Sequence, residues 1–151
     1  MNLEQARQNM VEQQIRTWEV LDQEVLDLLL TIRREDFVPP ASVKLAFAET
    51  SIPLGNGAAM LTPALEAKFV QALQSRKSDK VLEVGTGSGV QSAYIANLTE
   101  NAYTIEIIAP LAQRTRSVTT STPDFSKSAR SRTESTVSVI AGACWPMRSD
   151  T

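Results

Sequence analysis

The sequence contains no histidine and only one cysteine, Cys144, among its 151 residues. A single cysteine cannot form an intramolecular disulfide or a cysteine-rich zinc site, so we expect no metal centre. Without histidine, the common Ser-His and Cys-His catalytic pairs are excluded. Any chemistry that this chain performs must therefore proceed without an imidazole.

Long apolar runs are also missing. The longest cluster, residues 26–32, is interrupted by Asp27 and Thr31 and is much shorter than a membrane span. The first residues lack the basic-then-apolar arrangement of a secretory signal, which leads us to expect a cytoplasmic protein without membrane association. A net charge of −2 leaves no basic stripe for a nucleic acid. The composition is that of a globular chain long enough for one domain.

Glycine is sparse, but three of the six glycines, Gly85, Gly87 and Gly89, alternate in one stretch. The apolar run at residues 80–84 predicts a buried strand, and residues 90–98 can form a helix. Strand, glycine loop and helix together are typical of the first unit of a nucleotide-binding α/β fold. Glycines allow the sharp turn and let a ligand approach the backbone N–H groups.

Two acids accompany the glycines. Glu83 lies two positions before Gly85, and Glu106, near the end of a predicted strand at residues 101–108, follows Gly85 by 106 − 85 = 21 positions. That separation is close to the roughly 20 residues at which an acid reaches a ribose diol in such folds. A plain glycine turn between two strands would explain neither acid.

The spacing of the glycines differs from the dinucleotide fingerprint, so NAD or FAD is the weaker alternative. The pattern resembles motif I of S-adenosylmethionine-dependent methyltransferases, which implies that Glu83 approaches the methionine part of the cofactor. The expected cofactor-binding residues are Glu83, Gly85, Thr86, Gly87, Ser88, Gly89 and Glu106.

The sequence pattern predicts that the first half of the chain is mainly helical. Residues 3–16 form a polar helical pattern with a thin apolar stripe, and Asp22 can cap a helix over residues 23–33. Arg33 and Arg34 are expected to be the solvated end of that helix rather than a substrate clamp. Residues 44–62 are expected to be mostly irregular, and a loop of this length and apolarity suggests a functional cover. Next, Thr62 caps a helix that has Pro63 in its first turn.

These segments carry a resemblance to one family. The chain resembles the protein-L-isoaspartate O-methyltransferases over about residues 9–115, in the blocks at residues 10–15, 34–39, 46–49, 52–55 and 81–89. The resemblance implies an α/β Rossmann-like methyltransferase sandwich with an N-terminal helical cap. It also implies methyl transfer from S-adenosyl-L-methionine to the free carboxyl group of isoaspartyl residues in damaged proteins or peptides. We expect a monomer.

The substrate loop departs from the family at two positions. The family's active-site serine falls on Leu61, which leaves the neighbouring Thr62 as the only nearby hydroxyl and the candidate catalytic residue. Glu49 stands where the family usually has aspartate, and we group it with Gly55 and Gly57 as substrate-loop residues. These departures keep open a divergent methyltransferase that acts on another substrate.

The predicted organisation has three parts. Residues 1–62 form the helical and substrate-loop region, residues 63–115 form the first half of the cofactor-binding domain, and residues 116–151 form an atypical tail. The tail is rich in Ser, Thr and Arg, so we expect disorder, apart from residues 137–141, which can form a strand. An out-of-frame reading of a longer gene is one explanation, and a natural flexible tail is the other. Because few core strands can be placed, the domain is expected to be incomplete, and a non-catalytic fragment remains an alternative.

Overall fold

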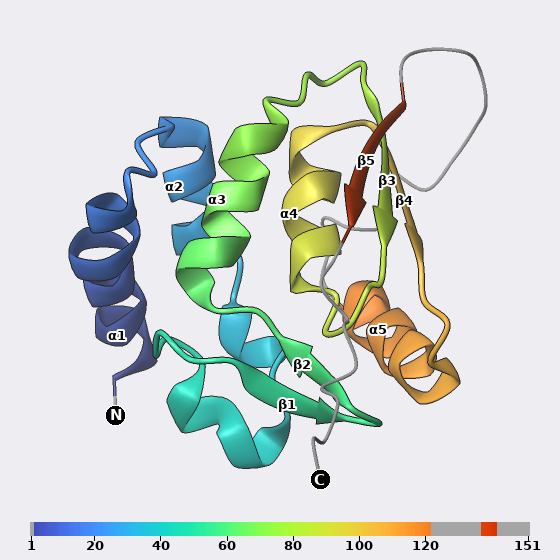
Figure 1. The fold of residues 1–151 in the computed structure, drawn as a ribbon. Coiled ribbons are helices and arrows are strands. Elements are labelled where there is room, and N and C mark those ends of the chain that lie inside the picture. Colours follow the sequence, from blue (N-terminus) through green and yellow to red (C-terminus); the bar gives the residue numbers. More distant parts are fainter. Residues whose placement is uncertain (1, 122–136, 142–151) are drawn as a thin grey trace, which may run out of the picture.

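A computed structural model describes residues 2–121 and 137–141, and it has helices at one end and a parallel sheet at the other (Figure 1). Helix α1, Leu3–Met10, continues through a π turn at Val11–Ile15 and a 3-10 turn at Arg16–Trp18. The predicted helical segment at residues 3–16 is therefore confirmed. Helix α2, Gln23–Thr31, begins where Asp22 accepts hydrogen bonds from the backbone N–H groups of Glu24 and Val25.

Two 3-10 turns, Arg34–Asp36 and Pro40–Leu45, lead into a hairpin made of β1, Ile52–Gly55, and antiparallel β2, Ala58–Met60. The expectation that residues 44–62 are mostly irregular is therefore wrong for the hairpin. Its turn contains Asn56 and Gly57, both at positive φ. An Asn-Gly pair between apolar residues is a strong hairpin signal because both residues tolerate that conformation.

Thr62 caps helix α3, Pro63–Leu73, as predicted. The chain then alternates strand and helix through β3, Lys80–Val84, α4, Val90–Leu98, β4, Asn101–Ile105, and α5, Ala109–Ser121. Strand β5, Val137–Ala141, returns to the other side of β3. The sheet has the order β4-β3-β5 with parallel pairing throughout (Figure 1). The strand order therefore reverses at β3, which is where open α/β sheets bind their ligands.

The α/β, Rossmann-like fold class is confirmed, but the predicted tail needs a correction. Helix α5 continues to Ser121, so the disorder expected from residue 116 is wrong for residues 116–121. The strand allowed at residues 137–141 is confirmed as β5. Residues 122–136 and 142–151 lie outside the described residues, so the frame-shift hypothesis remains a prediction.

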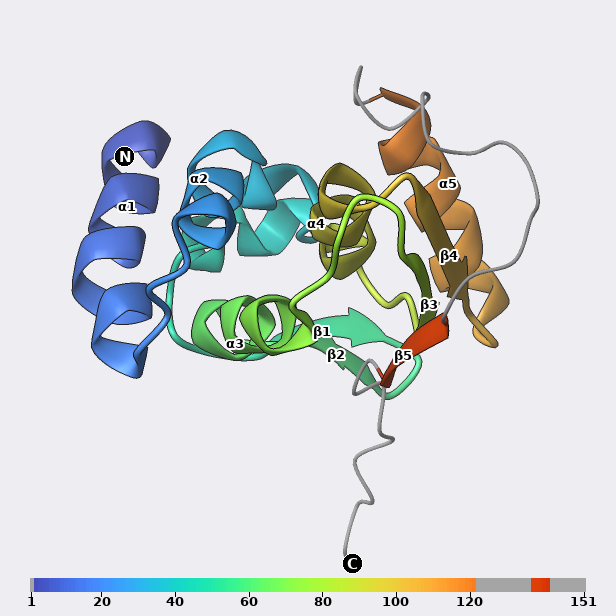
Figure 2. The same cartoon turned by 90° about the horizontal axis from the view of Figure 1, so that it is seen from above.

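Helix α4 joins the two ends of the molecule and lies between α2 and α3 on one side and the sheet on the other (Figure 2). Val90, Ala93 and Tyr94 of α4 belong to the large apolar core with the N-terminal helices and the hairpin, while Ile95 packs on Val81 of β3. Because it packs on several sides, α4 buries the polar side chains of Gln91 and Ser92 as well as its apolar ones. Within the described residues, no helix has the length and apolarity needed to cross a membrane.

Candidate cofactor and substrate site

The glycine loop, residues 85–89, connects the carboxyl end of β3 to the start of α4. Gly85, Gly87 and Gly89 have φ values of +89°, +55° and +88°, a region that other residues rarely occupy. The backbone N–H of Gly85 donates to the carbonyl of Ile105 over 2.8 Å, and that of Gly89 donates to the carbonyl of Thr86 over 2.9 Å. These bonds fold the loop tightly, and only glycine satisfies its geometry without strain.

Helix α5 packs directly against this loop. A Cβ atom on Gly89 would lie 2.6 Å from Cγ2 of Thr115, which is too close for any side chain to fit without movement. The Thr115 hydroxyl also donates to the carbonyl of Gly87 over 3.3 Å. Glycine is thus required at position 89 for two reasons: the positive φ of its backbone and the close approach of Thr115.

The structure brings Glu106 to the loop, as its spacing in the sequence predicts. One carboxylate oxygen accepts a hydrogen bond from the backbone N–H of Gly87 over 2.8 Å, and the other accepts from that of Ile108 over 2.9 Å. Glu106 follows the end of β4, so it lies at the carboxyl edge of the sheet next to the switch point. Its carboxylate is within reach of any group that occupies the loop.

Glu83 lies under the loop, on the side of the sheet that faces α4. Its side chain is 1% exposed and accepts hydrogen bonds from the hydroxyls of Ser92 and Thr104. Because Thr104 directs its proton to Glu83, the Thr86 hydroxyl is the donor in the 2.5 Å contact with Thr104. Burial raises the pKa of Glu83 to about 7, partly offset by its two hydroxyl donors.

The space beside Glu83 is a cavity of about 20 Å³, enough for one water molecule and too small for a cofactor. Glu83 therefore supports the glycine loop indirectly, through its hydrogen bonds to Ser92 of α4 and Thr104 of β4. Ser88 has a similar local task, since its buried hydroxyl oxygen accepts from the backbone N–H of Val90 over 3.4 Å.

The predicted substrate loop lies beside the glycine loop. Gly55 ends β1 and Gly57 lies in the turn of the hairpin, and Leu54 of β1 points its Cδ1 to within 3.5 Å of where a Cβ on Gly87 would be. The exposed Glu49 lies further back, where one carboxylate oxygen accepts from the backbone N–H of Ala64 at the start of α3 over 3.2 Å. The hairpin thus approaches the glycine loop through Leu54.

Thr62, the candidate catalytic hydroxyl, is the N-cap of α3. Its Oγ1 accepts from the backbone N–H of Leu65 over 3.5 Å. Leu61 is half-buried, and its carbonyl accepts from a guanidinium nitrogen of Arg34 over 2.7 Å. The hydroxyl of Thr62 therefore has a structural partner in this structure.

Sequence reasoning missed Arg34. We expected it to be solvated, but it is 0% exposed and paired with Glu66 of α3, with Nε to Oε2 at 2.9 Å. Burial works against its charge, yet the Glu66 carboxylate raises the pKa of Arg34 above its ordinary value. No local pattern could reveal this pair, because the two residues are 66 − 34 = 32 positions apart.

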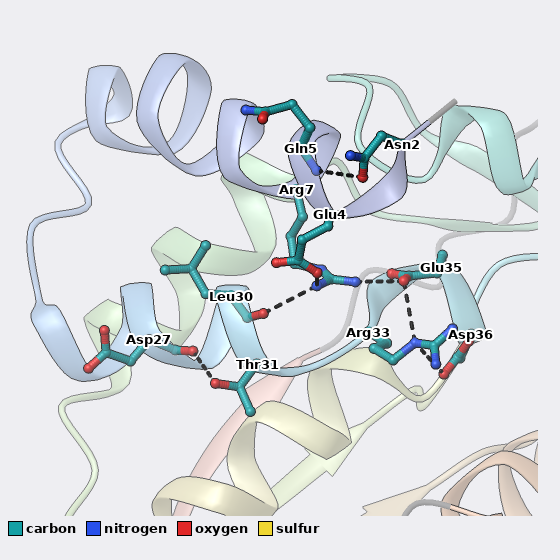
Figure 3. A network of polar contacts seen from close by, with 10 residues as sticks. All are labelled: Asn2, Glu4, Gln5, Arg7, Asp27, Leu30, Thr31, Arg33, Glu35 and Asp36. Atoms are coloured by element: carbon teal, nitrogen blue, oxygen red, sulfur yellow. Dashed lines mark hydrogen bonds and ion pairs between the residues drawn. The ribbon is translucent and has the colours of Figure 1, made fainter.

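A second buried pair lies nearby. Arg7 of α1 contacts Glu35 over 2.6 Å and Glu4 over 2.5 Å, and it also donates to the carbonyl of Leu30 over 3.4 Å (Figure 3). Arg33 lies at the exposed rim of this network, where its Nε is 3.4 Å from Glu35. Helix α2 already ends at Thr31, so neither arginine is its end; the expected solvation is correct for Arg33 and wrong for Arg34.

The chain matches one family. A sequence profile described as protein-L-isoaspartate(D-aspartate) O-methyltransferase matches residues 5–142, further than the motifs at residues 9–115 had indicated. Curated relatives include protein-L-isoaspartate O-methyltransferase 1 of Pelobacter propionicus and protein-L-isoaspartate O-methyltransferase 2 of Geotalea uraniireducens. Each is 40% identical over 116 residues, which cover 77% of this chain and 54% of the relative. The chain therefore spans about half the length of these relatives.

A solved structure with the same fold is described as a protein-L-isoaspartate O-methyltransferase from Plasmodium falciparum in complex with S-adenosyl-L-homocysteine. It has a TM-score of 0.62 and 18% sequence identity, and the match covers 93% of this chain and 62% of that one. At this identity the likeness supports the fold alone.

Proposed function

Because the chain belongs to the protein-L-isoaspartate(D-aspartate) O-methyltransferase family, we propose that it takes part in S-adenosylmethionine-dependent methylation of isoaspartyl carboxyl groups in damaged proteins. The observation that carries this proposal is the position of the hairpin beside the glycine loop, with Leu54 against Gly87. A methyltransferase needs its acceptor site next to its cofactor site, and these two segments, distant in the sequence, lie together. The proposal includes a cytoplasmic setting, where an unpaired cysteine is ordinary.

The cofactor would be held mainly by backbone. The glycine loop and the start of α4 present N–H groups at the switch point of the sheet, and Glu106 supplies a carboxylate of the kind that binds ribose hydroxyls. Glu106 now bonds the N–H groups of Gly87 and Ile108. We therefore expect bound ligand to compete with Gly87 for this carboxylate. Glu83 and Thr86 would act indirectly, by holding the loop in its conformation.

S-adenosylmethionine, when bound, supplies an electrophilic methyl group to the acceptor. A carboxyl group near its reference pKa of about 4 is ionised at neutral pH, so the chain does not have to provide a base. This agrees with a sequence that has no histidine. What the chain provides is orientation and exclusion of water by the hairpin, and orientation of this kind can lower a barrier by roughly 7–11 kcal/mol.

Leu61 favours the second candidate, a methyltransferase for another acceptor. Its side chain cannot donate a hydrogen bond to a carboxylate, and the hydroxyl of Thr62 already caps α3. If the acceptor is an isoaspartyl carboxylate, Leu61→Ser should raise the rate of methyl transfer to an isoaspartyl peptide, with a matched aspartyl peptide as the control. An unchanged rate in Leu61→Ser would favour the second candidate.

Cofactor binding is tested by isothermal titration with S-adenosylhomocysteine. We expect saturable binding to the wild-type chain and none to Gly89→Ala, whose Cβ would collide with Thr115 at positive φ. The control is Asp22→Ala, which removes the cap of α2 and costs about 1 kcal/mol of stability far from the loop. Equal binding by the wild type and Gly89→Ala would contradict the assignment of the loop.

A further inference from the structure

Arg34 joins three parts of the chain through a single buried guanidinium. Its Nε and Nη2 bind the two carboxylate oxygens of Glu66 over 2.9 and 3.2 Å. The same group donates to the carbonyl of Ala46 through Nη1 and to the carbonyl of Leu61 through Nη2, the latter over 2.7 Å. A planar guanidinium can serve all these acceptors at once, whereas the ammonium of lysine is a compact group with another geometry.

The two carbonyls are the ends of one segment. Ala46 and Leu61 are 61 − 46 = 15 positions apart, and the chain between them contains the whole β1–β2 hairpin. Arg34 therefore closes this segment at its base, while Glu66 fixes the guanidinium to α3. The tip of the same segment lies beside the glycine loop through Leu54.

A buried ion pair is weak evidence for stability, because desolvation offsets much of the attraction. The geometry points to a different use: we propose that Arg34 is a positioning residue that holds the base of segment 46–61 and thereby sets the place of the hairpin against the glycine loop. This inference rests on the proposed function for its catalytic meaning. Its structural content does not depend on activity.

The main test is hydrogen exchange of the backbone amides in the full chain carrying Arg34→Lys. Lysine keeps the positive charge but loses the planar fork, so we expect amides within the hairpin to exchange about tenfold faster or more. Amides of β3 and α4 should keep their protection. Unchanged hairpin protection would overturn the proposal, and so would an equal loss over the whole chain.

The matched control is Arg7→Lys, at a second buried arginine that is paired with a buried glutamate (Figure 3). The hydrogen bonds of Arg7 go to Glu4, Leu30 and Glu35, none of which belongs to segment 46–61. Arg7 also lies as a cation over the ring of Phe47, a residue of the segment, 5.7 Å from the ring centre. We expect Arg7→Lys to leave hairpin exchange near that of the wild type, and a hairpin as mobile as in Arg34→Lys would contradict a specific clamp.

A second variant separates positioning from global stability. The double substitution Arg34→Met with Glu66→Leu replaces the pair by apolar side chains, a change that often leaves overall stability intact. The carbonyls of Ala46 and Leu61 still lose their donor, so the hairpin should exchange faster in a folded chain. If the double variant were unfolded, or kept hairpin protection, Arg34 would not be a positioning residue.

A kinetic readout connects the clamp to the reaction. If the chain methylates an isoaspartyl peptide, Arg34→Lys should raise KM for the peptide about tenfold while leaving the Kd for S-adenosylhomocysteine unchanged. An equal weakening of both would show a general defect and overturn the proposal. A chain that binds no S-adenosylhomocysteine but shows the exchange pattern would refute the proposed function alone.

Discussion

The helical end and the sheet end of the molecule bury their side chains in different ways. Around α1 to α4 and the hairpin lies a broad apolar core, whereas the described part of the sheet packs on α4 through a small cluster centred on Val81 of β3 and Ile95 of α4. Buried carboxylates differ as well: Glu35 and Glu66 at the helical end have arginine partners, while Glu83 under the sheet is bonded to two hydroxyls. The helical end therefore holds the broad core and the arginine–glutamate pairs, and the sheet end contains the glycine loop and a buried acid without an arginine partner.

The two faces of the sheet show the same contrast. On the face that points to α4, Val81 and Glu83 of β3 are fully buried, and Ala102 of β4, the partner of Val81, is half-buried. On the opposite face, Val84, Tyr103 and Ile105 are 39%, 50% and 54% exposed. Parallel sheets normally have both faces covered. The described residues thus cover one face of this sheet well and leave apolar surface on the other.

The largest expected loss of stability comes from a cavity in the core at the helical end. Leu26→Ala should lower the free energy of unfolding by about 2–5 kcal/mol, because Leu26 is fully buried and the cavity cannot refill. Urea unfolding followed by circular dichroism measures the change. The control Leu21→Ala, at a largely exposed leucine, should stay within about 0.5 kcal/mol of the wild type. Similar losses in both variants would mean that burial of Leu26 in the core does not stabilise the helical end.

The next largest expected effect is the pH dependence of stability that comes from Glu83, the buried acid between the sheet and α4. The pKa of Glu83 is raised from 4.5 to about 7, so the unfolded chain loses this proton at lower pH than the folded chain does. The stabilisation from this carboxyl is complete below pH 4.5 and is lost as the pH rises through 7, a fall of about 3 kcal/mol.

The free energies of unfolding of the wild type and Glu83→Gln, measured from pH 4.5 to 8, isolate this contribution. Their difference should change with pH by about the predicted 3 kcal/mol. Glu100→Gln, at an exposed carboxylate, controls for the loss of one acid. A difference between the wild type and Glu83→Gln that stays constant with pH would show that Glu83 is ionised at no cost.

The smallest effect compares the two faces of the sheet. Tyr103→Thr with Ile105→Thr should change the free energy of unfolding by only about 0.5 kcal/mol, since both side chains are half-exposed and threonine suits a strand. Val81→Thr on the covered face should cost about 1–3 kcal/mol, because it buries a hydroxyl.

Sedimentation at increasing protein concentration adds a second readout, because exposed apolar patches favour association. The Tyr103 and Ile105 double variant should associate less than the wild type does. Equal stability losses on the two faces would mean that the far face is packed as well as the near one.

Much of the site could be predicted because its determinants are close together in the sequence. Alternating glycines between an apolar run and a helix specify the loop, since only glycine adopts these φ values freely. The caps at Asp22 and Thr62 are equally local. The hairpin also had a local signal, Asn56-Gly57, which the apolarity of the surrounding loop obscured.

By itself, then, the sequence determined the strand, loop and helix at residues 80–98, the helix starts and the family. Only the tertiary structure decided which way the charged side chains point. Arg34 is buried because Glu66, Ala46 and Leu61 converge on it from distant positions, and Glu83 faces Ser92 and Thr104 because α4 and β4 pack on that side of β3. The physical reason is that burying a charge is favourable only when its partners are assembled around it, and that assembly depends on the whole fold.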